Sequence, residues 1–130
     1  MQNLMLFTDG SVDPSSKIGY GSYLWVSDLN QSLELLKPRI QTLRFENTSS
    51  TKVEIQTLLC ALSELKTLPA AIGVYTDCQN MLSLPERRSR LEKKNYKSKK
   101  NDALALGNLY RAFFAWLDKL NFEIVKVKGH

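Results

Sequence analysis

Three carboxylates are the side chains of this sequence best placed to do chemistry. Asp9 and Asp77 each close a short apolar run with the pair Thr-Asp, in "FTDG" and "YTDC". If these runs are parallel neighbouring strands, both carboxylates project at the carboxyl edge of the sheet, where open α/β sheets bind ligands. Glu54, in the first turn of a predicted helix, can reach the same edge. Because converging carboxylates raise one another's pKa unless a cation neutralises them, the pattern predicts a metal site.

The ligand type indicates which metal such a site would hold. Carboxylate oxygens select hard cations such as Mg²⁺ or Mn²⁺, whereas zinc would ask for His or Cys. Two such ions about 3.5–4 Å apart are suited to phosphodiester hydrolysis, because they activate water and stabilise the leaving oxygen. Each residue also has a purely structural alternative: Asp9 and Asp77 as turn or N-cap residues, and Glu54 as the partner of Thr51 in a capping box.

A basic segment occupies residues 86–102. It contains eight basic and three acidic residues, so its net charge of +5 equals that of the whole chain. A concentrated positive patch on a neutral body is typical of a protein that binds a polyanion, since each neutralised phosphate releases counterions. The alternative is a solvated basic loop without a partner. Tyr96, inside the segment, can either stack on a base or sugar or anchor the segment to the core.

Apolar runs and alternation predict the strands that position these groups. Three strands are expected at residues 4–8, 19–26 and 33–45, the last broken near Lys37-Pro38, and their short connections favour an antiparallel meander. The stretch "DGSVDPSSKIGYG", which starts at Asp9, is rich in Gly, Pro, Ser and Asp and therefore predicts a turn. Further strands are expected at "AIGVYTD" and at "FEIVKVKGH".

Helical spacing of apolar residues predicts the remaining elements. Residues 55–62 follow the i, i+3, i+4, i+7 pattern, which indicates a helix from about Thr51 to before Pro69. A short helical stretch is expected at residues 78–84, before Pro85 and the basic segment. A second long helix is expected from Asp102, capped by Asn101 or Asp102. The order β-β-β-α-β-α-β predicts an α/β fold, with a mixed five-stranded sheet and helices packed on it.

Length and composition limit the remaining possibilities. With 130 residues and 43% hydrophobic content, the chain can bury one core, so we expect one domain, with monomer as the favoured state. No apolar run approaches the roughly 18 residues of a membrane span, and the first residues lack the features of a signal peptide. Cys60 and Cys78 have neither disulfide-framework nor metal-site spacing, which favours reduced thiols and a cytoplasmic location.

Four motifs occur in order along the chain: "FTDGS" at 7–11, "STKVEIQTLLCAL" at 50–62, "YTDCQ" at 75–79 and "VKVKGH" at 125–130. Together with the basic segment, they resemble the type 1 ribonuclease H family, and the likeness runs from about Leu4 to the last residue. The resemblance implies a ribonuclease H-like fold. We expect residues 1–130 to form a single such domain, which ends before the C-terminal helix where the family usually carries a fourth carboxylate.

The resemblance also implies an activity, namely metal-dependent cleavage of the RNA strand in RNA–DNA hybrids. Asp9, Glu54 and Asp77 are carried over as catalytic ligands of two Mg²⁺ ions, with Mn²⁺ as the other candidate. His130 matches the family's mobile histidine, which assists proton transfer or product departure. The positions that match the family's contacts with substrate lie near the carboxylates and in the basic segment, and they are Gly10, Ser11, Ser50, Thr51, Gln79, Arg87, Arg88, Lys97, Lys99 and Lys100.

Two other functions remain open at this point. The chain can be a non-catalytic module that binds hybrids or duplexes, with its affinity coming mainly from residues 87–100. It can also be a nuclease that acts on DNA, because one fold hosts several activities. Metal dependence separates the binding module from the enzymes, and an all-DNA substrate separates the two enzymes from each other.

Overall fold

The computed structural model describes residues 3–27, 30–97 and 106–128. The strands are β1 (Asn3–Asp13), β2 (Ile18–Val26), β3 (Gln41–Phe45), β4 (Ala71–Thr76) and β5 (Glu123–Lys126). The α-helices are α1 (Leu33–Leu36), α2 (Ser50–Ser63), α3 (Gln79–Lys93) and α4 (Gly107–Leu120), and a 3₁₀ turn, η1, covers Lys37–Arg39.

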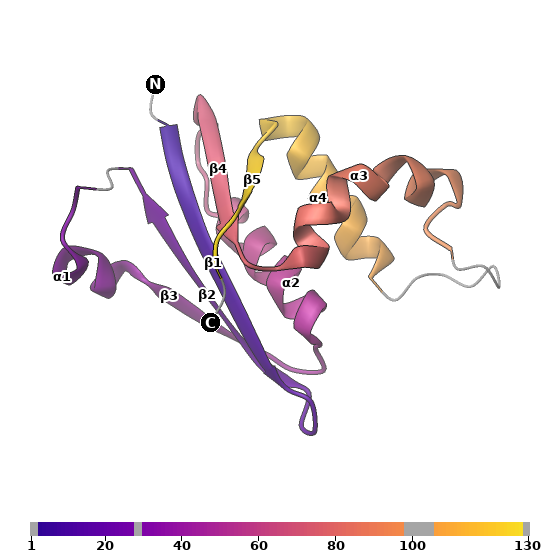
Figure 1. Cartoon of the computed structure of the whole chain (residues 1–130), viewed down its shortest axis with the longest axis horizontal. Coiled ribbons are helices and arrows are strands. Elements are labelled where there is room, and N and C mark those ends of the chain that lie inside the picture. The colour runs from indigo at the N-terminus through magenta and orange to yellow at the C-terminus, as the bar shows by residue number, and fades with distance from the viewer. Residues whose placement is uncertain (1–2, 28–29, 98–105, 129–130) are drawn as a thin grey trace.

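The strands form one mixed sheet in the order β3-β2-β1-β4-β5 (Figure 1). β1 pairs antiparallel with β2, and β2 pairs antiparallel with β3. β4 pairs parallel with β1, and β5 pairs parallel with β4. The predicted mixed five-stranded sheet, with its first three strands antiparallel, is therefore confirmed.

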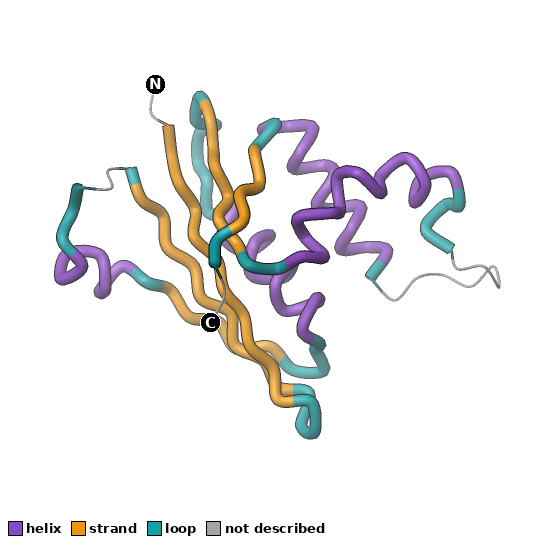
Figure 2. Tube along the Cα trace, in the orientation of Figure 1, coloured by secondary structure: helices purple, strands orange, loops and turns teal. Residues whose placement is uncertain are grey.

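Helices α2, α3 and α4 lie on the same side of this sheet, as the tube in Figure 2 shows. α2 packs on β1 and β2, α4 packs on α2, and α3 lies against β5 and α2. The core between the sheet and the helices is aliphatic and aromatic, and its largest fully buried side chains include Leu6, Ile55, Leu58, Val74 and Phe113. Burial of such side chains is the main favourable term in folding.

The first hairpin is longer than the sequence predicts. The expected turn over residues 9–21 is wrong, because pairing continues from Met5↔Val26 to Asp13↔Ile18. Only four residues, 14–17, form the connection. The carboxylate of Asp13 closes it by accepting hydrogen bonds from Ser15 and Ser16, and Lys17 adopts a left-handed φ of 59°.

The segment before β3 is also different from the prediction. Residues 33–36 form α1 and not a strand, whereas the predicted strand that ends at Phe45 is confirmed as β3. Ser32 caps α1 by accepting a hydrogen bond from the backbone N–H of Leu35, and Pro38 lies at the start of η1, where its missing N–H costs little. Two leucines of α1, Leu33 and Leu35, are 72% and 60% exposed.

Helix α3 passes through the position where it was expected to stop. It continues beyond Pro85 to Lys93, so most of the described basic segment is helical. Met81 and Leu84 are fully buried and Leu91 packs against the core, so apolar contacts on both sides of the proline hold the helix together. Tertiary packing here outweighs the unfavourable effect of proline in a helix interior.

The two long helices were predicted in the right places, with different ends. α2 is capped by Ser49, whose side chain accepts a hydrogen bond from the N–H of Lys52, so the capping box expected between Thr51 and Glu54 is wrong. α4 begins at Gly107, and the start expected at residue 102 lies outside the described residues. None of the helices in the described ranges has the length and apolar composition of a membrane span.

Candidate metal centre

Asp9 and Asp77 occupy matching positions on the two central strands. The parallel pairing of β1 with β4 ends at Phe7↔Tyr75, and two residues further along each chain lie Asp9 and Asp77. Asp77 directly follows the end of β4, as predicted. Asp9 lies inside β1, where it pairs with Ser22 of β2, so the sequence placed it wrongly at the end of a strand. It nevertheless lies just beyond the parallel pairing.

Glu54 reaches these two residues because α2 lies unusually close to the first hairpin. The close contact occurs over Gly10, Gly19 and Gly21, where a Cβ atom would collide with the helix or with the residues that precede it. A Cβ on Gly10 would lie 2.6 Å from the Glu54 Oε1 atom, and one on Gly21 would lie 2.9 Å from the Cβ of Thr57. Side chains at these positions would push α2 and its carboxylate away from the sheet.

The three carboxylates form a cluster of the size that a metal ion can bridge. One oxygen atom from each of Asp9, Glu54 and Asp77 lies within 4.8 Å of the other two. Asp9 is exposed, Asp77 is half-buried and Glu54 is only 6% exposed, so the cluster opens to solvent on one side. Three carboxylate ligands of this kind match the oxygen preference of Mg²⁺ and Mn²⁺.

Electrostatics show that the cluster needs positive charge. Burial, together with the nearby charges of Asp9 and Asp77, raises the pKa of Glu54 to about 7. Hydrogen bonds from the Thr76 hydroxyl and the Gly10 backbone to Glu54 oppose this rise. A divalent cation among the carboxylates would stabilise the ionised form of Glu54 and remove the repulsion. The donor set therefore fits a metal ion.

Thr76 is a site residue that sequence analysis did not single out. Its hydroxyl donates to the Glu54 Oε2 atom over 3.4 Å and accepts a hydrogen bond of 3.1 Å from the N–H of Cys78. It thus connects the buried carboxylate to the turn that carries Asp77. The sequence signal for Thr76 was its place in the Thr-Asp pair at the end of β4. Successive residues of a strand point to opposite faces, so the residue before Asp77 points to the face where it meets Glu54 of α2.

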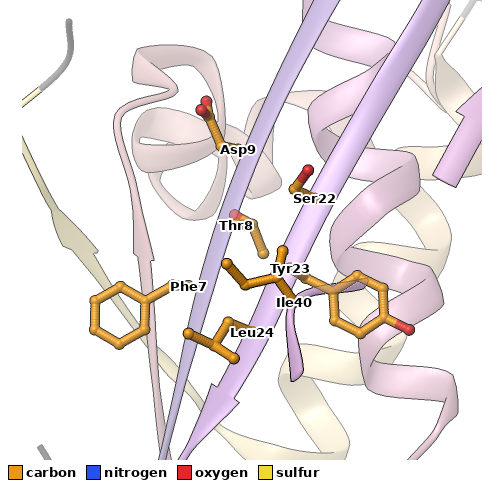
Figure 3. A pocket seen from close by; sticks show the side chains of 7 residues that line it. All are labelled: Phe7, Thr8, Asp9, Ser22, Tyr23, Leu24 and Ile40. Atoms are coloured by element: carbon orange, nitrogen blue, oxygen red, sulfur yellow. The ribbon is translucent and has the colours of Figure 1, made fainter. Parts of the chain in front are cut away.

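A hollow of about 190 Å³ lies next to Asp9 on the first hairpin (Figure 3). Its lining is largely apolar, and Phe7 in it stacks on Tyr75 with ring centroids 4.8 Å apart. In Figure 3 the Asp9 carboxylate lies at one end of the hollow and points away from Phe7 and Leu24. The carboxylate is therefore presented to solvent at the border of an apolar surface.

The predicted substrate contacts around the cluster lie close to it. Gly10 and Ser11 follow Asp9 in β1, and Ser11 is exposed. Ser50 and Thr51 form the first turn of α2, one turn before Glu54. Gln79 opens α3 and is exposed. The predicted residues His130, Lys99 and Lys100 lie outside the described residues.

The basic residues of α3 differ in how they are engaged. Arg88 forms a two-pronged ion pair with Asp118 of α4, at 2.5 and 2.7 Å, and its guanidinium lies 5.0 Å above the Phe114 ring. Arg87 donates to the backbone oxygen and to the side chain of Asn80. Arg87 and Arg88, both predicted substrate contacts, therefore also have partners within the protein. Lys97, a third predicted substrate contact, is half-buried and lies just after α3.

Tyr96 anchors the basic segment. It is 8% exposed, its ring lies near that of Phe114, and the Arg111 guanidinium lies 4.5 Å from the ring centroid. Of the two alternatives left open for this residue, the structure supports the anchor.

Two further cations of the basic segment, Arg90 and Lys93, were not singled out as individual substrate contacts from the sequence. Arg90 and Lys93 line a surface hollow of about 530 Å³, together with Glu86, Arg87 and Ser89. Both cations are exposed, and among the described residues neither forms an ion pair. Their spacing of three residues would have placed them on one helix face, but only if α3 had been expected to continue past Pro85.

Fold and site together define a ribonuclease H-like α/β domain with an acidic cluster beside its central parallel strands. Foamy viral protease–reverse transcriptase, solved in complex with dsDNA, has the same fold: its similarity has a TM-score of 0.71 over 99% of this chain and 82% of that chain, at 10% sequence identity. A family model described as RNase H matches residues 1–130. The chain belongs to the RNase H family. A search of curated proteins finds no match.

Proposed function

We propose that this protein is a metal-dependent endonuclease that hydrolyses the RNA strand of RNA–DNA hybrids. The observation that carries the proposal is the convergence of Asp9, Glu54 and Asp77 within 4.8 Å, in a chain of the RNase H family. Membership of the family and the acidic cluster support a nuclease of the RNase H type. The hybrid substrate and the metal dependence go beyond this support, and they are the parts of the proposal that the experiment below tests.

The metal proposed for this site is Mg²⁺, with Mn²⁺ as an alternative, held by the three carboxylates. Held by Asp9, Glu54 and Asp77, two such ions would supply an activated water and would stabilise the leaving oxygen of the phosphodiester. The protein's own contribution is to fix the ligands, because Glu54 is carried on α2 and buried, whereas Asp9 is exposed and Asp77 is half-buried. His130 is proposed to assist proton transfer or product departure.

Substrate recognition is proposed to use two surfaces. Polar groups in the first turn of α2 and at the start of α3 lie beside the cluster and can read the 2′-hydroxyls that distinguish an RNA strand from DNA. The cations of α3 and of the segment after it are proposed to bind the phosphates of the other strand. Neutralising Lys97, Lys99 and Lys100 together should then lower the affinity and weaken its dependence on salt.

The test is cleavage of a labelled RNA–DNA hybrid with and without Mg²⁺, for the unmodified protein and for Asp9→Asn. We expect Mg²⁺-dependent cuts in the RNA strand, which Asp9→Asn abolishes while hybrid binding is kept or strengthened, since one repulsive charge is removed. Asp13→Asn is the matched control, because Asp13 lies in the same strand and serves only the hairpin turn. Cleavage by Asp9→Asn at a near-normal rate would contradict the metal-site assignment.

A second candidate is a nuclease of the same fold that cuts DNA. It is favoured by one observation, namely that the similar foamy viral structure is a complex with dsDNA. An all-DNA duplex of the same sequence, added to the cleavage experiment, distinguishes the two enzymes. Salt-sensitive hybrid binding without any metal-dependent cleavage would instead identify a binding module.

A further inference from the structure

Three polar side chains connect α3 to the first turn of α2. The Arg87 Nη2 atom donates to Asn80, both to its backbone oxygen over 3.1 Å and to its side-chain oxygen. The Asn80 Nδ2 atom in turn donates to the Thr51 Oγ1 atom over 3.1 Å. Asn80 lies three residues after Asp77, and Thr51 lies three residues before Glu54, so the connection runs along the border of the acidic cluster.

Hydrogen-bond chemistry gives this connection a fixed direction. A guanidinium has only donors, so the side-chain atom of Asn80 that faces Arg87 must be the oxygen. The amide nitrogen of Asn80 must therefore face Thr51. Since that nitrogen only donates, the Thr51 oxygen has to accept. Arg87 thus determines the role of the Thr51 hydroxyl through Asn80.

The hydrogen atom of the Thr51 hydroxyl is then available to another acceptor. Within a helix a threonine hydroxyl often donates to the carbonyl four residues earlier. For Thr51 that residue is Asn47, which precedes α2 and whose oxygen already accepts from the Lys52 ammonium at 3.1 Å. In the part of the chain that the structure describes, no acceptor for the Thr51 hydroxyl is found, and the residue is half-buried.

We propose that Asn80 is a positioning residue that presents Thr51 as a hydrogen-bond donor to a 2′-oxygen of the RNA strand beside the scissile phosphate. This inference rests on the proposed function and specifies how its substrate is distinguished from DNA. Arg87 fixes the side chain of Asn80, Asn80 fixes the hydroxyl of Thr51, and Thr51 is the residue that contacts the 2′-oxygen. A deoxyribose at the contacted nucleotide offers no 2′-oxygen and leaves the donor unpaired.

The experiment uses a set of hybrids with one cleavage site, in each of which a single nucleotide near that site is 2′-deoxy. For the unmodified protein, one position in the set should raise KM about tenfold, the effect of one lost hydrogen bond. Asn80→Ala and Thr51→Val should each raise KM for the all-ribose hybrid by a similar factor, with kcat nearly unchanged. In both variants, the 2′-deoxy substitution at that position should have no further effect.

Two comparisons separate positioning from general damage. The double variant should be no worse than Thr51→Val, because Asn80 acts through Thr51. Ser83→Ala is the matched control, since the Ser83 hydroxyl donates to the backbone oxygen of Asn80 over 3.2 Å and leaves its side chain untouched. This control should keep the full response to the 2′-deoxy nucleotide. If Asn80→Ala does not fold, Asn80→Asp replaces it, because aspartate still accepts from Arg87 but cannot donate to Thr51.

The outcomes distinguish this inference from the function on which it rests. If the unmodified protein cleaves the hybrid and Asn80→Ala keeps the full 2′-deoxy effect, the role of Asn80 is wrong while the nuclease stands. The same holds if no position in the set affects the unmodified protein. If the unmodified protein neither binds nor cleaves the all-ribose hybrid, both proposals are wrong.

Discussion

Gly10 and Glu54 lie so close together that a methyl group on Gly10 would come within 2.6 Å of the Glu54 Oε1 atom. Gly10 directly follows Asp9 in β1, and its backbone N–H donates to the Asp9 Oδ1 atom over 2.9 Å. One residue without a side chain therefore determines how near two ligands from different elements can approach. The glycine is part of the candidate metal centre although it offers no ligand atom.

Gly10→Ala should weaken metal binding far more than it weakens the fold. The added methyl group meets the end of a flexible side chain, so the Glu54 carboxylate can turn away at little cost, but it then leaves its position between Asp9 and Asp77. We expect Mg²⁺ affinity to fall at least tenfold in a calorimetric titration. Gly73→Ala is the control, because a methyl group on this strand glycine would meet the Tyr75 ring and not Glu54. Unchanged affinity in Gly10→Ala would mean that Glu54 is not a ligand.

Gly21→Ala should act on stability. The new methyl group would overlap Thr57, which is fully buried and donates to the Val53 oxygen over 2.7 Å, so α2 must move away from the hairpin. Overpacking of this kind should lower the free energy of unfolding by about 3 kcal/mol in a urea titration. Adding Thr57→Ala to Gly21→Ala should recover part of the loss. A double variant less stable than Gly21→Ala would exclude this contact as the cause.

The stability of the metal-free protein should depend on the protonation of Glu54. Because its pKa rises from 4.5 to about 7 on folding, the folded state binds this proton more tightly than the unfolded state. The resulting stabilisation is fully present below pH 4.5 and is lost as the pH rises through 7. Chemical denaturation in a chelator, from pH 4 to 8, should show this decline in the unmodified protein and not in Glu54→Gln.

A bound metal ion should favour the ionised form of Glu54, whereas folding of the metal-free protein favours its protonated form. At pH 8 saturating Mg²⁺ should raise the melting temperature of the unmodified protein, since the ion binds the folded state and needs ionised ligands. At pH 5 the same addition should have a much smaller effect. An increase of equal size at both pH values, or in Glu54→Gln at pH 8, would place the ion elsewhere.

Arg90 and Lys93 should contribute to hybrid affinity through charge. If both contact phosphates, replacing them with Gln should reduce the slope of log affinity against log salt by about 2, since each contact contributes roughly 0.9. Fluorescence anisotropy over a range of KCl concentrations measures this slope. Arg44→Gln is the control, because Arg44 lies on β3 and is already paired with Glu46 at 2.8 Å. An unchanged slope in the double variant would show that this surface does not contact the nucleic acid.

The strands and the acidic residues could be predicted from the sequence because both depend on local patterns. Short apolar runs indicated β4 and β5, and the Thr-Asp pairs indicated where two carboxylates would meet. The sequence also predicted that Glu54 would join them. What it could not show was the cause, since the contact of α2 with Gly10 and Gly21 joins residues more than 30 positions apart.

The errors have a common physical origin. Pro85 and the glycines of the first hairpin favour a break when only neighbouring residues are considered. In the folded chain, buried contacts of Met81, Leu84 and Leu91 carry α3 past the proline, and the pairing Gly10↔Gly21 continues the strands. Local preference is a weak term that packing can override. The hydrogen bond between Asn80 and Thr51 depends on how α2 and α3 are placed, so no local sequence pattern predicts it.

Because α3 continues through Pro85, it sets a fixed distance between the acidic cluster and the exposed cations at its far end. It starts at Gln79, two residues after Asp77, and carries Arg90 eleven residues further on, which at 1.5 Å per residue is about 17 Å. Nucleotides follow one another at about 3.4 Å along a strand, so this distance corresponds to roughly five base pairs. If the proposed hybrid substrate lies along α3, hybrids shorter than this can contact the carboxylates or the far end of α3, but not both. In that case the length of one helix would set the shortest substrate that gains from both surfaces.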